Sequence, residues 1–144
     1  MGASILAILS EIVHTQGMLV LVADDEPTSL LLMRSYLGAL AKVIVRENGV
    51  EAWEGYLEHR PDLVVLDLGM PGLSGHEVAR RIRATPDGHR CRLLAMSASP
   101  AVDIGITAAD GLWDGYLEKP VSRSTLAKIA IKLLKIVDAD PCSP

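Results

Sequence analysis

Short apolar runs that recur along most of the chain constrain its fold more than any other feature. Five segments have the length and composition of short strands: residues 19–23, 42–46, 63–66, 92–96 and 115–118. They alternate with segments that read as helices, a rhythm that predicts a parallel sheet covered by helices on both faces. Right-handed crossovers and a switch point beside the first strand favour strand order 2-1-3-4-5, which is a doubly wound α/β fold.

The segments between the strands carry helix signals of different strength. Pro27 is suited to the first turn of a helix, and Ser122 can cap the helix that runs to about Val137. Two more helices are predicted, one from Asn48-Gly49 to just before Pro61 and one from Gly75 to Ala84. Residues 101–109 contain Gly105, which costs a helix interior roughly 1 kcal/mol relative to Ala. We therefore expect that helix to be short or mobile.

The first 17 residues lie outside this alternation. Four apolar residues share one face of a helix of roughly four turns: Ile5, Ile8, Leu9 and Ile12. A short helix is marginal alone in water, so we expect it to pack against another surface. The alternative, weighed equally, is that these residues are the tail of an upstream linker. The predicted division is an amphipathic extension or linker over 1–17, one domain over 18–137 and a tail over 138–144.

Composition excludes several classes of protein. A chain of 144 residues with 49% hydrophobic and 22% charged residues is one ordinary globular domain. Its net charge of −4 argues against nucleic-acid binding, and no apolar run approaches the ~20 residues that would span a bilayer. Cys91 and Cys142 are expected to be free thiols in a reducing compartment, which predicts a cytoplasmic protein.

Acidic residues follow two of the predicted strands. Asp24 and Asp25 come directly after the first strand, Asp67 ends the third, and Lys119 follows the fifth. Carboxyl ends of parallel strands share one edge of the sheet, where α/β proteins bind ligands. Crowded carboxylates need a compensating cation, and Mg²⁺ prefers such oxygen ligands. The alternative is that the Asp residues only cap helices or open turns.

Four motifs in this order resemble the receiver domain of two-component response regulators. They occupy residues 22–27, 66–75, 96–98 and 115–120, with the sequences VADDEP, LDLGMPGLSG, MSA and GYLEKP. The resemblance spans about residues 18–137. It implies the flavodoxin-like fold with five parallel strands in the order 2-1-3-4-5.

The resemblance also implies the roles of individual residues. Asp67 would accept a phosphoryl group. Asp25, Asp67 and the carbonyl of Gly69 would bind Mg²⁺ directly, with Asp24 acting largely through a metal-bound water.

Three more positions carry roles implied by the family. Ser97 would hydrogen-bond the phosphoryl group, and Lys119 would pair with it. The peptide bond between Lys119 and Pro120 would be cis. Tyr116 holds the aromatic switch position. By contrast, Arg80, Arg81 and Arg83 are expected to form a solvated helix face and not a phosphate clamp.

The expected donor is a phosphohistidine on a sensor histidine kinase or a histidine phosphotransfer protein. The chain would then be no enzyme beyond its own phosphoryl transfer and dephosphorylation. One alternative is a Mg²⁺-dependent phosphatase with an Asp nucleophile; Gly69 stands where such enzymes usually place a second Asp. The other is an interaction module that is never phosphorylated.

The last helix suggests self-association. Its apolar residues cover an arc of roughly 220°, whereas packing on a sheet needs little more than 100°. Four residues suit the core face: Leu126, Ile129, Leu133 and Val137. A second strip is left over, made of Ala127, Ile131 and Leu134. Either the amino-terminal helix or a second copy would cover it, and we favour a dimer through the last helix and the fifth-strand edge.

Overall fold

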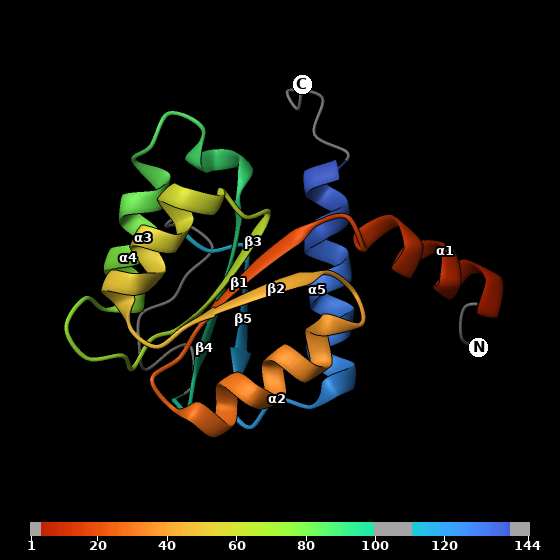
Figure 1. The fold of residues 1–144 in the computed structure, drawn as a ribbon, viewed down its shortest axis with the longest axis horizontal. Helices are drawn as coiled ribbons and strands as arrows, with labels where there is room; N and C mark the ends of the chain where they lie inside the picture. The colour runs from red at the N-terminus through yellow and green to blue at the C-terminus, as the bar shows by residue number, and fades with distance from the viewer. Residues whose placement is uncertain (1–3, 100–110, 139–144) are drawn as a thin grey trace.

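The fold is a single five-stranded parallel sheet between two layers of helices (Figure 1). The computed structural model describes residues 4–99 and 111–138. The strands are β1 Leu19–Ala23, β2 Lys42–Arg46, β3 Leu63–Asp67, β4 Arg92–Ser97 and β5 Gly115–Glu118. Their order is β2-β1-β3-β4-β5, which confirms the predicted fold class and strand order.

Within residues 4–99 and 111–138, two helices lie on each face of the sheet. The helices are α1 Ile5–Thr15, α2 Pro27–Gly38, α3 Gly49–His59, α4 Gly75–Arg83 and α5 Arg123–Asp138, with a short 3-10 helix η1 at Gly88–Arg90. α2 contacts α5 on one face, and α3 contacts α4 on the other. The helix predicted over residues 101–109 lies outside the described residues.

Alternation along β1 divides the core into two clusters. Val20 and Val22 pack toward α2 and α5, whereas Leu21 and Ala23 pack toward α3 and α4. All residues of β3 are buried, because helices cover both faces of this central strand. The apolar runs of the sequence therefore mark strands that contact both layers.

The contact face of α5 differs from the predicted one. Leu126, Ala130, Leu133 and Leu134 are at most 2% exposed. Leu134 was predicted on the outer strip, and that assignment was wrong; Ile129 and Val137 are only half-buried. The apolar arc is about twice as wide as one contact face, so the helical period alone could not fix the rotation of α5.

The amino-terminal helix α1 extends away from the sheet beside α5, which it contacts (Figure 1). Three of its apolar side chains are largely in solvent: Ile5 is 75% exposed, Leu6 79% and Leu9 51%. No element within residues 4–99 and 111–138 covers them. None of the helices in these ranges combines the length and hydropathy needed to cross a bilayer.

Candidate functional site

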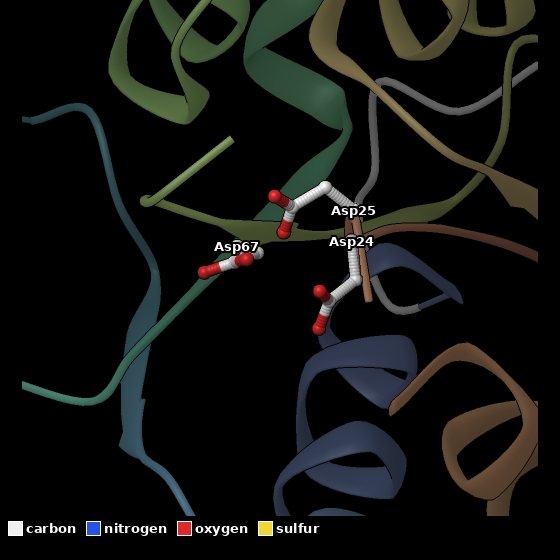
Figure 2. A group of neighbouring side chains, drawn as sticks. All are labelled: Asp24, Asp25 and Asp67. Atoms are coloured by element: carbon white, nitrogen blue, oxygen red, sulfur yellow. The ribbon is translucent and has the colours of Figure 1, made fainter. Parts of the chain in front are cut away.

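Three carboxylates meet at the carboxyl edge of the sheet. β1 and β3 are neighbours, with Ala23 opposite Leu66, so the residues that follow them come together. One carboxylate oxygen from each of Asp24, Asp25 and Asp67 lies within 4.8 Å of the others (Figure 2). Asp24 is fully buried and Asp67 is 7% exposed, whereas Asp25 faces solvent. The group is therefore open on one side.

Backbone amides hold the two buried carboxylates in place. Oδ1 of Asp24 accepts a hydrogen bond of 2.9 Å from the amide of Glu26. Oδ1 of Asp67 accepts one of 3.1 Å from the amide of Gly69, in the turn after β3. Both carboxylates thus keep a second oxygen for other partners.

Lys119 reaches both buried carboxylates from the end of β5. Its Nζ lies 2.7 Å from Oδ2 of Asp24 and 3.5 Å from Oδ2 of Asp67. The amide of Lys119 donates to the carbonyl of Ser97, and the Lys119–Pro120 peptide bond is cis. We call Asp24, Asp25, Asp67 and Lys119 the carboxyl-edge cluster.

The carboxyl-edge cluster contains more carboxylates than ammonium groups. Burial is the main cause that raises the pKa of Asp67, and the charge of Asp24 adds to it, against the opposing effects of the Gly69 amide and Lys119. Burial lowers the pKa of Lys119, but its hydrogen bond to Asp24 and the charges of Asp67 and Asp24 outweigh this and raise it. Lys119 thus serves two of the three carboxylates, and the cluster keeps an excess of carboxylate oxygens that suits a hard divalent cation such as Mg²⁺.

Two hydroxyl groups converge on the backbone of Ser99. Ser97 ends β4 and is 8% exposed, and its Oγ accepts a hydrogen bond of 3.0 Å from the amide of Ser99. Tyr116 is half-buried, and its hydroxyl donates to the carbonyl of Ser99. Because Tyr116 pairs with Ala95, its side chain lies on the same face of the sheet as that of Ser97. Sequence reasoning missed Ser99, which contributes only backbone atoms.

Sequence reasoning also missed a network at the opposite edge. Arg83 lies 2.7 Å from Asp114, and Arg92 lies 3.1 Å from the same carboxylate. Arg83 further donates to the carbonyls of Gly88, Cys91 and Leu112. The predicted solvated face was wrong for Arg83, whose side chain is only 16% exposed. We call Arg83, Arg92 and Asp114 the amino-edge network.

The other two arginines of α4 behave as predicted. The side chains of Arg80 and Arg81 are 63% and 45% exposed, and both lie near Glu77. Arg80 and Arg81 therefore form a solvated face, unlike Arg83.

Comparison with known proteins gives one family. The sequence profile of the response regulator receiver domain matches residues 20–131. The chain is 38% identical over 113 residues to the virulence sensor protein BvgS of Bordetella pertussis, covering 74% of this chain and 9% of that protein. It is 34% identical over 128 residues to the response regulator MprA of a Mycobacterium species, covering 88% of this chain and 55% of that protein.

A solved structure of similar fold comes from Pseudomonas aeruginosa. It is the receiver domain of a sensor histidine kinase with a magnesium ion coordinated in the active-site cleft. The TM-score is 0.75 at 25% identity, covering 83% of this chain and 98% of that one. The chain spans less than two thirds of BvgS and of MprA, so the activities of those whole proteins do not transfer with the match. Fold, strand-end residues and profile agree, and the chain belongs to the response regulator receiver domain family.

Proposed function

We propose that the chain is a phosphoacceptor module of a two-component phosphorelay, with Asp67 as the acceptor. The donor would be a phosphohistidine on a sensor histidine kinase or a histidine phosphotransfer protein. The observation that carries the proposal is the contact of Lys119 with both Asp24 and Asp67 beside a third carboxylate. A structural salt bridge would need one carboxylate, not three.

Each residue then has a definite chemical task. An oxygen of Asp67 forms a bond to phosphorus while the bond from phosphorus to the donor imidazole nitrogen breaks. Asp25, Asp67 and the Gly69 carbonyl would hold Mg²⁺, with Asp24 acting largely through water. The ion supplies charge neutralisation of the transferred oxygens. Lys119 pairs with one phosphoryl oxygen, and the hydroxyl of Ser97 donates to another.

The Ser97–Ser99–Tyr116 contacts supply a route to a changed surface. Phosphorylation adds about −1.5 to −2 charges at the end of β3. If the Ser97 side chain rotates so that its hydroxyl reaches and donates to the phosphoryl group, Oγ moves away from the Ser99 amide from which it now accepts. Tyr116 holds the carbonyl of the same residue, so its ring responds to that change. We infer that the switch acts on the surface around β5.

An apolar cavity beside Lys119 suits the docking of the donor. Its volume is about 390 Å³, and it opens between α2 and the segment after β5. Leu32 of α2 is 47% exposed there, and Pro120 and Val121 form the other wall. An apolar helix face of the donor would bury these side chains and bring its histidine toward Asp67.

The remaining attributes are also proposals. Gly69 carries no side chain that could act as a general acid, so we assign no phosphatase activity toward other substrates. The free thiol of Cys91 suits a reducing compartment such as the cytoplasm.

Phosphorylation with a small phosphodonor and Mg²⁺ tests the function. Wild-type protein should gain a single acyl phosphate that hydroxylamine removes, and Asp67→Ala should gain none. Asp87→Ala is the matched control, since Asp87 is exposed and pairs with Arg60. Label retained at the wild-type level in Asp67→Ala contradicts the assignment. Steady turnover of phosphate esters would favour the phosphatase, and protein that neither binds Mg²⁺ nor takes label would be a pure interaction module.

We also propose self-association through α5 and the β5 edge. Exposed apolar side chains of α1 and Ile136 of α5, which is 45% exposed, support it. Sedimentation should show dimers for the full chain and monomers for Ile131→Lys. A shortened chain without residues 1–16 tests whether α1 or a second copy covers the apolar strip of α5. If only the shortened chain self-associates, α1 covers the strip within the full chain. Monomers in all three forms, with and without a phosphoryl mimic, reject the dimer.

A further inference from the structure

The first residue of α3 touches the loop that follows the proposed acceptor. Gly49 is buried, and a Cβ at this position would lie 1.8 Å from the carbonyl oxygen of Leu73 and 2.7 Å from its carbonyl carbon. Leu73 belongs to residues 68–74, which connect β3 to α4 and which we call the β3–α4 loop. No side chain fits between helix and loop unless one of them moves.

α3 is the part that cannot easily move. The side chain of Asn48 caps the helix by accepting a hydrogen bond of 2.8 Å from the amide of Glu51. Ala52 and Tyr56 are at most 2% exposed in the core. At Gly55, a Cβ would lie 2.9 Å from the side chain of Leu21, so the helix already sits tightly on β1. An added methyl group at Gly49 must therefore displace the loop.

The loop transmits such a displacement toward the carboxyl-edge cluster. Two residues after Leu73 the loop enters α4 at Gly75, where a Cβ would lie 2.7 Å from the carbonyl oxygen of Asp67, so this end of the loop packs against the end of β3. Four residues before Leu73, at the β3 end of the same loop, the amide of Gly69 donates to the Asp67 carboxylate. We propose that Gly49 is a positioning residue: its missing side chain sets the place of the β3–α4 loop, and hence of the Gly69 carbonyl and the Asp67 carboxylate. This inference rests on the proposed function for its chemical meaning.

Two glycine substitutions with similar steric cost provide the test. Gly49→Ala should weaken Mg²⁺ binding at least tenfold by titration calorimetry, at a temperature where the variant is folded. Gly88→Ala is the control. Gly88 follows the end of α4 that is distant from the β3–α4 loop, and its Cβ would lie 1.7 Å from the carbonyl oxygen of Ile82. It should lose stability but keep the wild-type Mg²⁺ affinity.

Amide spectra of the metal-free variants give a second measurement that does not depend on metal binding. Gly49→Ala should shift the amides of Gly69 and its loop neighbours, and Gly88→Ala should not. Unchanged Mg²⁺ affinity and unchanged loop amides in Gly49→Ala overturn the inference, as do equal losses of affinity in both variants.

A third variant covers the case in which Gly49→Ala does not fold. Leu73→Ala leaves Gly49 intact but removes the side chain that anchors the loop against the α3–α4 cluster. It should bind Mg²⁺ several-fold more weakly, and wild-type affinity in this variant rejects the role of the loop contact. Failure of the function itself looks different: wild-type protein would bind no Mg²⁺, while the loop amides of Gly49→Ala or Leu73→Ala would still report on the contact.

Discussion

The carboxyl-edge cluster and the amino-edge network are built from the same kinds of residue but differ in balance. Asp114 accepts hydrogen bonds from Arg83, Arg92 and the amide of Leu93. At the other edge, Lys119 contacts two carboxylates, those of Asp24 and Asp67, and Asp25 lies beside them. The amino-edge network thus has two cationic groups around one carboxylate, whereas at the carboxyl edge the carboxylates outnumber the lysine that contacts them. A surplus of carboxylates at a strand edge suits a cation-binding site. The same substitution should therefore have opposite effects at the two edges.

The largest effect is expected at the amino edge. Asp114→Asn leaves Arg83 and Arg92, both mostly buried, without their counter-charge. The free energy of unfolding should fall by about 3 kcal/mol, as for a broken buried ion pair. Urea unfolding measures this, with Asp87→Asn as the control, because an exposed pair such as Asp87–Arg60 contributes at most about 1 kcal/mol. Equal losses in the two variants would remove the distinction between network and surface pair.

Added Mg²⁺ should stabilise the carboxyl edge. A ligand that binds only the folded state contributes about 2.7 kcal/mol at a free concentration 100 times its Kd. Thermal unfolding with and without Mg²⁺ measures this gain, which Asp25→Ala should abolish and Asp87→Asn should keep. A full gain in Asp25→Ala would place the metal elsewhere on the protein.

Removing a charge from the carboxyl edge should stabilise the metal-free protein. Burial and Asp24 raise the pKa of Asp67, so its ionised form is unfavourable in the folded state. The stability that Asp67 contributes is fully present below its ordinary pKa of 3.8 and is lost as the pH rises through the raised value. Asp67→Asn should therefore be more stable than wild type at neutral pH, by up to about 1 kcal/mol. The difference between the two proteins should vanish at low pH; a difference that grows there contradicts the pKa direction.

The smallest effect concerns Cys91, beside the amino-edge network. Burial raises the pKa of this thiol from 9.0 to about 12. Its contribution to stability is present below pH 9 and is lost as the pH rises toward 12, because the unfolded thiol ionises first. Between pH 8 and pH 9 the expected loss is roughly 0.4 kcal/mol. Cys91→Ala should lack this part of the pH dependence, and identical slopes for the two proteins would show that the thiol is not protected.

The two edges also differ in how much of their structure could be predicted from the sequence. The strands followed from the apolar runs, and their order followed from right-handed crossovers and a switch point beside the first strand. Asp24, Asp25, Asp67 and Lys119 met because the carboxyl ends of parallel strands share an edge. Both inferences needed only local pattern and topology.

Other features depend on contacts between distant segments. Nothing near Arg83 in the sequence indicates that it meets Asp114, which is 31 positions away. The rotation of α5 was ambiguous because its apolar arc was too wide. The approach of Gly49 to Leu73 depends on how α3 sits on the sheet, which no local pattern contains.

The hydrogen bond between Lys119 and Asp24 joins residues 95 positions apart, and it has a consequence for biosynthesis. A growing chain displays Asp24, Asp25 and Asp67 long before Lys119 is made. Until β5 docks at the edge of β4, the carboxylates face one another without their lysine. A nascent or truncated chain therefore carries the proposed acceptor without the lysine that, in the proposed function, helps transfer a phosphoryl group to it. Under the proposed function, completion of the sheet and competence to receive a phosphoryl group become one event.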